Sequence, residues 1–174
     1  MHTGIRALHR AAVIVAAVTG LVMPVVPSSA LAAPKETEST YCAIIIEKLK
    51  PGEKTSKVVR EATCGADHAA VTSQLGPMTS TLLMHWCQNA NCFGGWGTDI
   101  YGSDGPCDQL GYGISFVGWG FNDAISAWNV YNSCNNTWAF DHENYYGDWQ
   151  QYYGNVGYCG NFMNDRISSF KIFK

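Results

Sequence analysis

The chain repeats one pattern at an interval of 42 residues. Residues 114–131 correspond to residues 156–173, and each copy carries an Asn-Asp-x-x-Ser turn followed by alternating aromatic and aliphatic positions. Such alternation is typical of a half-buried β-strand. An internal repeat of this kind predicts two copies of one supersecondary unit that pack on each other. It also places the same set of side-chain oxygens in both copies.

The first 32 residues have the pattern of a secretory leader. Arg6 and Arg10 precede an apolar run over residues 11–26, and the Ala-Leu-Ala sequence that ends at Ala32 is typical of a cleavage site. The alternative is a membrane anchor, but the run is shorter than the roughly 20 residues that span a bilayer. We therefore expect cleavage after Ala32 and a secreted, extracellular product without a membrane segment.

The charge distribution argues against nucleic acid as a partner. The chain has a formal net charge of −3, and loss of the leader with its two arginines brings it to −5. From Glu61 onward, three basic residues face ten acidic ones. Phosphate backbones are bound mainly by Lys and Arg, so a surface of this kind repels them, whereas it favours divalent cations.

Seven cysteines follow the leader, which in an extracellular protein usually indicates disulfides. They are Cys42, Cys64, Cys87, Cys92, Cys107, Cys134 and Cys159. We favour Cys42 with Cys64 and Cys87 with Cys92, which leaves Cys107 and Cys134 for each other. Cys159 aligns with Val117 in the repeat and is interpreted as a small buried side chain. Sequence alone does not fix the connectivity.

A zinc clip is the alternative at two of these cysteines. His85, Cys87 and Cys92 offer three metal-binding atoms, but a structural zinc site needs a fourth ligand. A disulfide is therefore favoured.

The mature chain is predicted to be all-β. Residues 41–49 and 55–61 form a hairpin around a Lys-Pro-Gly-Glu turn, and residues 66–74 are the best candidate for a short helix. Further strands are expected at residues 81–85, 113–117, 125–131, 137–140 and 167–173. Short strands separated by frequent turn residues indicate a sandwich or barrel.

The second repeat carries a more specific signature. Residues 140–147 fit the pattern aromatic-x4-aromatic-x-Gly, and Asn164-Asp165-Arg166-Ile167-Ser168-Ser169 follows. Together they resemble the βγ-crystallin Greek-key motif and the calcium-binding signature of its microbial members. The resemblance implies a βγ-crystallin-type Greek-key sandwich of two motifs, over about 81–131 and 137–174. Residues 33–80 precede it as an extension with a disulfide-closed β-hairpin.

The first repeat departs from this pattern. Phe93-Gly94-Gly95 supplies an aromatic residue and a glycine, but Gln88 stands where the other aromatic residue is expected. About ten extra residues lie between Tyr101 and Tyr112, and Ala127 replaces the last serine of the signature. We expect the first hairpin to be reshaped.

The resemblance implies two calcium sites, each built from one loop and from the hairpin of the other motif. The candidate ligands are Asn122, Asp123, Ser126 and Asp141 for one site, and Asn164, Asp165 and Ser168, with Gln88 or Asn89, for the other. Calcium takes six to eight oxygen ligands, which such loops provide together with backbone carbonyls and water. The alternative is that these residues are ordinary turn formers.

Three functional hypotheses follow. The first is a non-catalytic, monomeric calcium-binding module, because the chain has neither a Gly-x-Ser-x-Gly elbow nor a His-Glu-x-x-His motif. The second is an inhibitor of a secreted metalloprotease, since some secreted bacterial proteins of this type are grouped with such inhibitors, and the insertion 102–111 is its candidate loop. The third is a toxin or lectin that binds cell-wall glycans through the aromatic cluster at residues 145–153.

Overall fold

The computed structural model describes residues 40–77 and 79–174. Its strands are β1 (Thr40–Ile46), β2 (Val58–Glu61), β3 (Thr81–Cys87), β4 (Trp96–Gly102), β5 (Tyr112–Ile114), β6 (Ala127–Val130), β7 (Asn136–Phe140), β8 (Trp149–Tyr153) and β9 (Ser169–Phe173), with helix α1 (His68–Ser73) and the 3₁₀ turns η1 (Ala90–Cys92) and η2 (Glu143–Tyr145). The predicted leader lies outside the described residues. No helix in the described part of the chain is long and apolar enough to cross a membrane.

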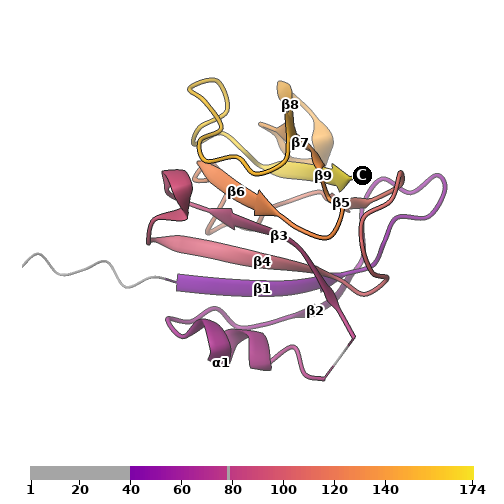
Figure 1. Ribbon diagram of the computed structural model, residues 1–174. Helices are drawn as coiled ribbons and strands as arrows, with labels where there is room; N and C mark the ends of the chain where they lie inside the picture. The colour runs from indigo at the N-terminus through magenta and orange to yellow at the C-terminus, as the bar shows by residue number, and fades with distance from the viewer. Residues whose placement is uncertain (1–39, 78) are drawn as a thin grey trace, which may run out of the picture. The chain divides into compact units, whose positions relative to one another are not determined.

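The first sheet has five strands in the order β2-β1-β4-β3-β6 (Figure 1). β3 pairs antiparallel with both β4 and β6, and β1 lies parallel to β4 on its other side. The predicted β1–β2 hairpin is confirmed. It extends the sheet of the first motif.

The second sheet has four strands in the order β5-β9-β7-β8, and it shows that the two motifs exchange strands. Ile114 of β5, from the first motif, pairs with Phe170 of β9. At the equivalent place in the repeat, Val156 of the second motif forms a bridge with Trp128 of β6. Each motif therefore completes the sheet of the other, and the predicted two-motif Greek-key sandwich is confirmed.

Large aromatic side chains fill the space between the sheets. Trp86, Trp128 and Phe170 are fully buried there. The Trp86 and Phe170 rings stack with centroids 5.6 Å apart, and Trp128 meets Phe170 edge-on at 5.3 Å. Burial of this size supplies the main driving force for folding.

A second, smaller core covers the outer face of the first sheet. Alternation along β1 directs Ala43 and Ile45 away from the main core, where they pack with Val71 and Leu75 at the helical segment. Asp67 caps α1 by accepting hydrogen bonds from the backbone N–H groups of residues 69 and 70. The short helix expected within residues 66–74 is thereby confirmed.

A buried carboxylate fixes the helix to the sheet. Asp99 of β4 contacts His68 Nε2 of α1 and His85 Nδ1 of β3, both at 2.6 Å. Burial raises the pKa of Asp99, but the hydrogen bonds with His85 and His68 outweigh it and leave that pKa below its ordinary value of 3.8.

The loop between β1 and β2 crosses to the second sheet, beside β5 (Figure 1). The Ser56 N–H donates to the carbonyl of Gly113 at 2.8 Å, and the Leu49 N–H donates to that of Gly111 at 3.0 Å. A Cβ at Gly113 would collide with the carbonyl oxygen of Lys54, so only glycine permits this approach.

Three disulfides confirm the favoured pairing: Cys42–Cys64, Cys87–Cys92 and Cys107–Cys134. Cys159 is a free, buried thiol, also as predicted. Because both sulfurs beside His85 belong to one disulfide, the zinc alternative does not apply to this oxidised form.

Candidate metal centre

The Asn-Asp loops of the two repeats have the same backbone. The N–H groups of Asn122 and Asn164 donate to the carbonyls of Gly118 and Gly160, and the next residue in each loop, Asp123 or Asp165, adopts a left-handed conformation. Their φ angles are 57° and 55°, in a region that Asp and Asn tolerate better than most residues. The sequence repeat is therefore a structural repeat down to single dihedral angles.

Side-chain hydrogen bonds orient the amide of each loop. Asn122 Nδ2 donates to Asp123 Oδ2 at 2.8 Å, and Asn164 Nδ2 donates to Asp165 Oδ2 at 2.7 Å. Both amide oxygens are buried and have no hydrogen-bond partner among the described residues. A buried oxygen without a partner is costly, so its presence in both copies needs a reason.

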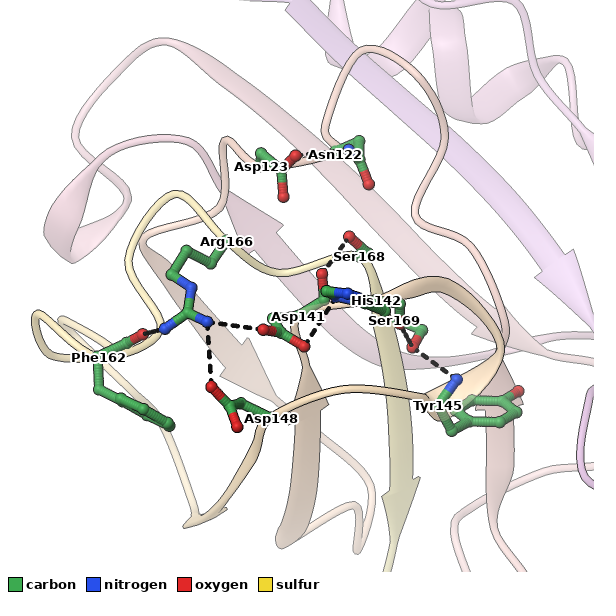
Figure 2. Close-up of polar contacts among 10 residues, drawn as sticks. All are labelled: Asn122, Asp123, Asp141, His142, Tyr145, Asp148, Phe162, Arg166, Ser168 and Ser169. Atoms are coloured by element: carbon green, nitrogen blue, oxygen red, sulfur yellow. Dashed lines mark hydrogen bonds and ion pairs between the residues drawn. The ribbon is translucent and has the colours of Figure 1, made fainter.

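The loop of the first repeat faces the hairpin of the second. Together they enclose a shallow space of about 580 Å³, which we name the inter-repeat hollow. Its lining residues are Asn122, Asp123, Asp141, His142, Glu143, Tyr146 and Ser168. Figure 2 shows Asn122 and Asp123 across from Ser168 and Asp141.

Asp141 is the most buried acid of this hollow, with 7% of its side chain exposed. Its Oδ2 accepts a hydrogen bond from Arg166 Nη2 at 2.7 Å (Figure 2). His142 Nδ1 lies 3.0 Å from Oδ1, but the geometry is not that of a hydrogen bond, so Oδ1 has no hydrogen-bond partner in the described part of the chain. A Cβ at Gly147 would collide with this Oδ1 atom. The glycine of the aromatic-x4-aromatic-x-Gly pattern thus makes room for the carboxylate.

Arg166 balances part of the negative charge. Besides Asp141, its Nη2 contacts Asp148 Oδ2 at 3.2 Å, and Nη1 donates to the Phe162 carbonyl at 2.9 Å (Figure 2). Arg166 stands at a position where the calcium signature accepts any residue, so the sequence alone assigns it no role. A cationic side chain that does not itself line the hollow therefore pairs with the acid that we predicted as a ligand.

The serines are exchanged relative to the sequence-based grouping. We placed Ser126 with Asn122 and Ser168 with Asn164, but Ser168 lines the hollow that contains Asn122. The reason is that each serine directly precedes a strand and contacts the hairpin of its own repeat. The N–H groups of Ser126 and Ser168 donate to the carbonyls of Cys87 and Phe140. The Asn-Asp pair that precedes each serine faces the other repeat.

Asn164, Asp165 and Ser126 lie apart from the hollow, at the equivalent place of the other half. Gln88 corresponds to Asp141 there. Gln88 directly follows Cys87 and Asp141 directly follows Phe140, and the backbone N–H of each donates across its own hairpin. The grouping of the second loop with the neutral Gln88 or Asn89 stays a prediction. Glu143 and His142 line the hollow but were not among our predicted ligands; their position directly after Asp141 was the available signal.

The first hairpin corrects our alignment. The structure puts Cys87 and Cys92 at the positions of the aromatic pair Phe140 and Tyr145, so the interpretation of Phe93 as that aromatic residue was wrong. Phe93 is 83% exposed. The hairpin is folded nevertheless, since Asn91 and Cys92 have the same left-handed φ angles as Asn144 and Tyr145.

Comparison with known proteins gives structural similarities alone. No protein-family model and no curated protein matches the chain. A βγ-crystallin domain from Clostridium beijerinckii is similar at 18% identity and a TM-score of 0.40, over 52% of this chain and 97% of that one. A βγ-crystallin domain from Flavobacterium johnsoniae has 13% identity and a TM-score of 0.39, over 52% and 93% of the two chains. The N-terminal domain of protein S has 17% identity and a TM-score of 0.40, over 53% and 96%. These similarities concern the fold of about half of this chain.

Proposed function

We propose that this protein is a secreted, non-catalytic module that binds calcium in the inter-repeat hollow. The observation that carries the proposal is the pair of buried oxygens, Asn122 Oδ1 and Asp141 Oδ1, that have no hydrogen-bond donor among the described residues. Both belong to residues that line the same hollow. An ion that accepts oxygen ligands removes the cost of leaving them unpaired.

The chemistry of the donor set fits calcium better than a softer metal. The hollow offers carboxylates from Asp123, Asp141 and Glu143, an amide oxygen from Asn122 and a hydroxyl from Ser168. Calcium prefers such hard oxygen ligands and tolerates irregular geometry, with water in the remaining positions. His142 is the one imidazole and no cysteine is present among the lining residues, so the set differs from the thiolate and imidazole sets that select zinc or copper.

Bound calcium would link the two repeats. Asn122 and Asp123 come from the first motif, whereas Asp141 and Ser168 come from the second. A ligand that binds the folded protein alone stabilises it, by about 2.7 kcal/mol at a free concentration 100 times the dissociation constant. The proposed role is therefore a calcium-stabilised extracellular domain.

Calorimetric calcium titration of the oxidised protein tests this, with melting curves in calcium and in EDTA. We expect binding in the wild type and a loss of about tenfold or more in affinity for Asp141→Asn. The matched control is Asp148→Asn, which also removes an ion pair to Arg166 but lies outside the lining of the hollow. If calcium produces no heat of binding and the melting curves in calcium and in EDTA are identical, both loops are ordinary turns and the proposal is wrong.

A second candidate, inhibition of an extracellular protease, is supported by the insertion at residues 102–111. Cys107 is tied to Cys134, the Lys48 N–H donates to Asp104 at 2.9 Å, and Tyr112 donates to the Gly105 carbonyl at 2.6 Å. Leu110 is 47% exposed on this braced loop. A rigid exposed loop suits a protease cleft, because little ordering is needed on binding. The test is inhibition of secreted metalloproteases by the wild type and by Leu110→Asp.

A further inference from the structure

The outer face of the second sheet carries a groove lined by aromatic rings. It has a volume of about 690 Å³ and is lined by Lys54, Thr55, Trp138, Phe140, Asn144, Tyr145, Tyr146, Trp149 and Lys171. Lys54 and Thr55 come from the β1–β2 loop that crosses to this sheet, and the rest come from the second motif. We name this the aromatic groove.

Strand alternation explains why these side chains face outward. Thr137, Ala139, Phe170 and Ile172 are fully buried between the sheets, so Trp138 and Lys171, which pair across β7 and β9, point to the opposite side. The solvent-facing side of an antiparallel sheet is normally polar. Here it presents aromatic rings instead.

The rings in the groove pack against one another and several of them are accessible. Trp138 and Trp149 have centroids 5.2 Å apart and planes inclined by 38°. Trp149 is 50% exposed and Tyr146 is 71% exposed. The indole N–H of Trp138 is buried without a hydrogen-bond acceptor among the described residues. These rings give the groove an exposed aromatic surface on which another ring can stack.

Two lysines add positive charge to a strongly acidic chain. Lys54 and Lys171 both line the groove, and within the described residues neither forms an ion pair. Lys171 Nζ lies 4.8 Å from the centroid of the Tyr145 ring. Burial, and repulsion by Lys54, lower the pKa of Lys171. Two facing ammonium groups without a counter-ion attract an anion.

We propose that the aromatic groove binds an acidic saccharide, a chain of sugar rings that bear carboxylates. The C–H faces of a sugar ring carry partial positive charge and stack on the negative face of an indole ring. The ammonium groups of Lys54 and Lys171 match the carboxylates, and Asn144 and Thr55 offer hydrogen bonds to hydroxyl groups. Nucleic acid has the same stacking and charge but needs many more basic residues than this surface carries.

The test is titration of the full oxidised protein with oligogalacturonate, followed by tryptophan fluorescence and calorimetry. The matched ligand is the fully methyl-esterified oligomer, which has the same rings without the charge. EDTA is present throughout, so that calcium binding in the neighbouring hollow has no part in the result. We expect the acid to bind at least about tenfold more tightly than its ester, with an affinity that falls as salt is added.

Variants locate the site. Trp149→Ala and Lys171→Gln should each weaken binding by about tenfold. Trp119→Ala and Lys57→Gln remove an exposed tryptophan and an exposed lysine elsewhere and should leave binding unchanged. Absence of binding, equal binding of acid and ester, or equal loss in the control variants would overturn the proposal. So would equal or tighter binding of polyadenylate or of polyglutamate, since the groove would then select charge and not sugar. Melting curves verify that each variant is folded.

Discussion

The two repeats build the same folded hairpin with different chemistry. In the first, Cys87 and Cys92 form a disulfide; in the second, Phe140 and Tyr145 occupy those positions with ring centroids 5.6 Å apart. In the first hairpin the neutral Gln88 follows Cys87, whereas in the second hairpin Asp141 follows Phe140. A covalent link makes the hairpin independent of its aromatic residues, whereas the second hairpin uses rings and charge that also line its two candidate binding sites. The first repeat thus has a hairpin closed by a disulfide, and the second has a hairpin whose residues line both candidate sites.

The largest expected effect is the loss of an aromatic residue from the second hairpin. Phe140 is 7% exposed, and Phe140→Ala should lower the free energy of unfolding by about 4 kcal/mol, because it leaves a cavity beneath Tyr145 and Trp149. Phe93→Ala, in the first hairpin, should cost less than about 0.5 kcal/mol, since the ring is exposed. Denaturant unfolding measures both. Equal costs would show that the two hairpins rely on aromatic residues alike.

The next largest effect concerns the contact between the first sheet and helix α1. Asp99→Ala removes hydrogen bonds to His68 and His85 and should cost about 3 kcal/mol, at about 1.5 kcal/mol for each bond to a charged group. The pKa of Asp99 is depressed on folding, so its contribution is complete above the ordinary value of 3.8 and is lost as the pH falls through the lower folded pKa. Thermal melts from pH 6 to pH 2 should therefore show a steeper loss for the wild type than for Asp99→Ala. Parallel curves would contradict this assignment.

Removal of the disulfide from the first hairpin should have a smaller effect. Cys87→Ser with Cys92→Ser opens a loop with a sequence separation of 5 and should cost about 2 kcal/mol in the chain-entropy treatment. Cys42→Ser with Cys64→Ser, with a separation of 22, should cost about 3 kcal/mol by the same treatment. The variant without the Cys87–Cys92 disulfide should bind calcium in the inter-repeat hollow with unchanged affinity, because the hollow is lined by residues of the second hairpin and not of the first. A loss of that affinity would show that the halves are coupled.

The smallest effect concerns one hydroxyl. Ser169 Oγ accepts from the Tyr145 N–H at 3.1 Å and donates to the His142 carbonyl at 2.6 Å, so Ser169→Ala should cost about 1 kcal/mol. The equivalent residue in the first repeat is Ala127, and the Cys92 N–H already donates to the Asn89 carbonyl. Ala127→Ser would therefore bury a hydroxyl and should destabilise by about 1 kcal/mol. A gain in stability would show that the Cys87–Cys92 disulfide does not fulfil in the first hairpin the role that Ser169 has in the second.

Much of the fold could be predicted from the repeat, because strand alternation and turn residues are local signals. β4 and β8 were not predicted. β4 is a central strand, with Thr98, Asp99 and Ile100 all buried, and it contains two glycines, so it lacks an alternating pattern. β8 has the sequence Trp-Gln-Gln-Tyr-Tyr, in which neither face is apolar. The parallel pairing of β1 with β4 joins distant segments and has no local signal at all.

The sequence identified the candidate loops, but it did not show which of their residues lie together. The Asn-Asp-x-x-Ser pattern identifies the loops, yet only the three-dimensional exchange between repeats brings Ser168 to Asn122. Likewise, the equivalence of Cys87 with Phe140 depends on backbone hydrogen bonds and not on residue type. The ion pair between Arg166 and Asp141 connects positions 25 apart and could not be inferred from either motif.

The buried thiol of Cys159 has a consequence for the order of events during oxidative folding. Burial raises its pKa to about 11, so the native protein holds almost no thiolate at neutral pH and its disulfides are safe from internal exchange. In an unfolded chain the same thiol has an ordinary pKa and attacks disulfides far more readily. Closure of the C-terminal motif over Cys159 therefore ends the period of folding in which this thiol exchanges with the three disulfides.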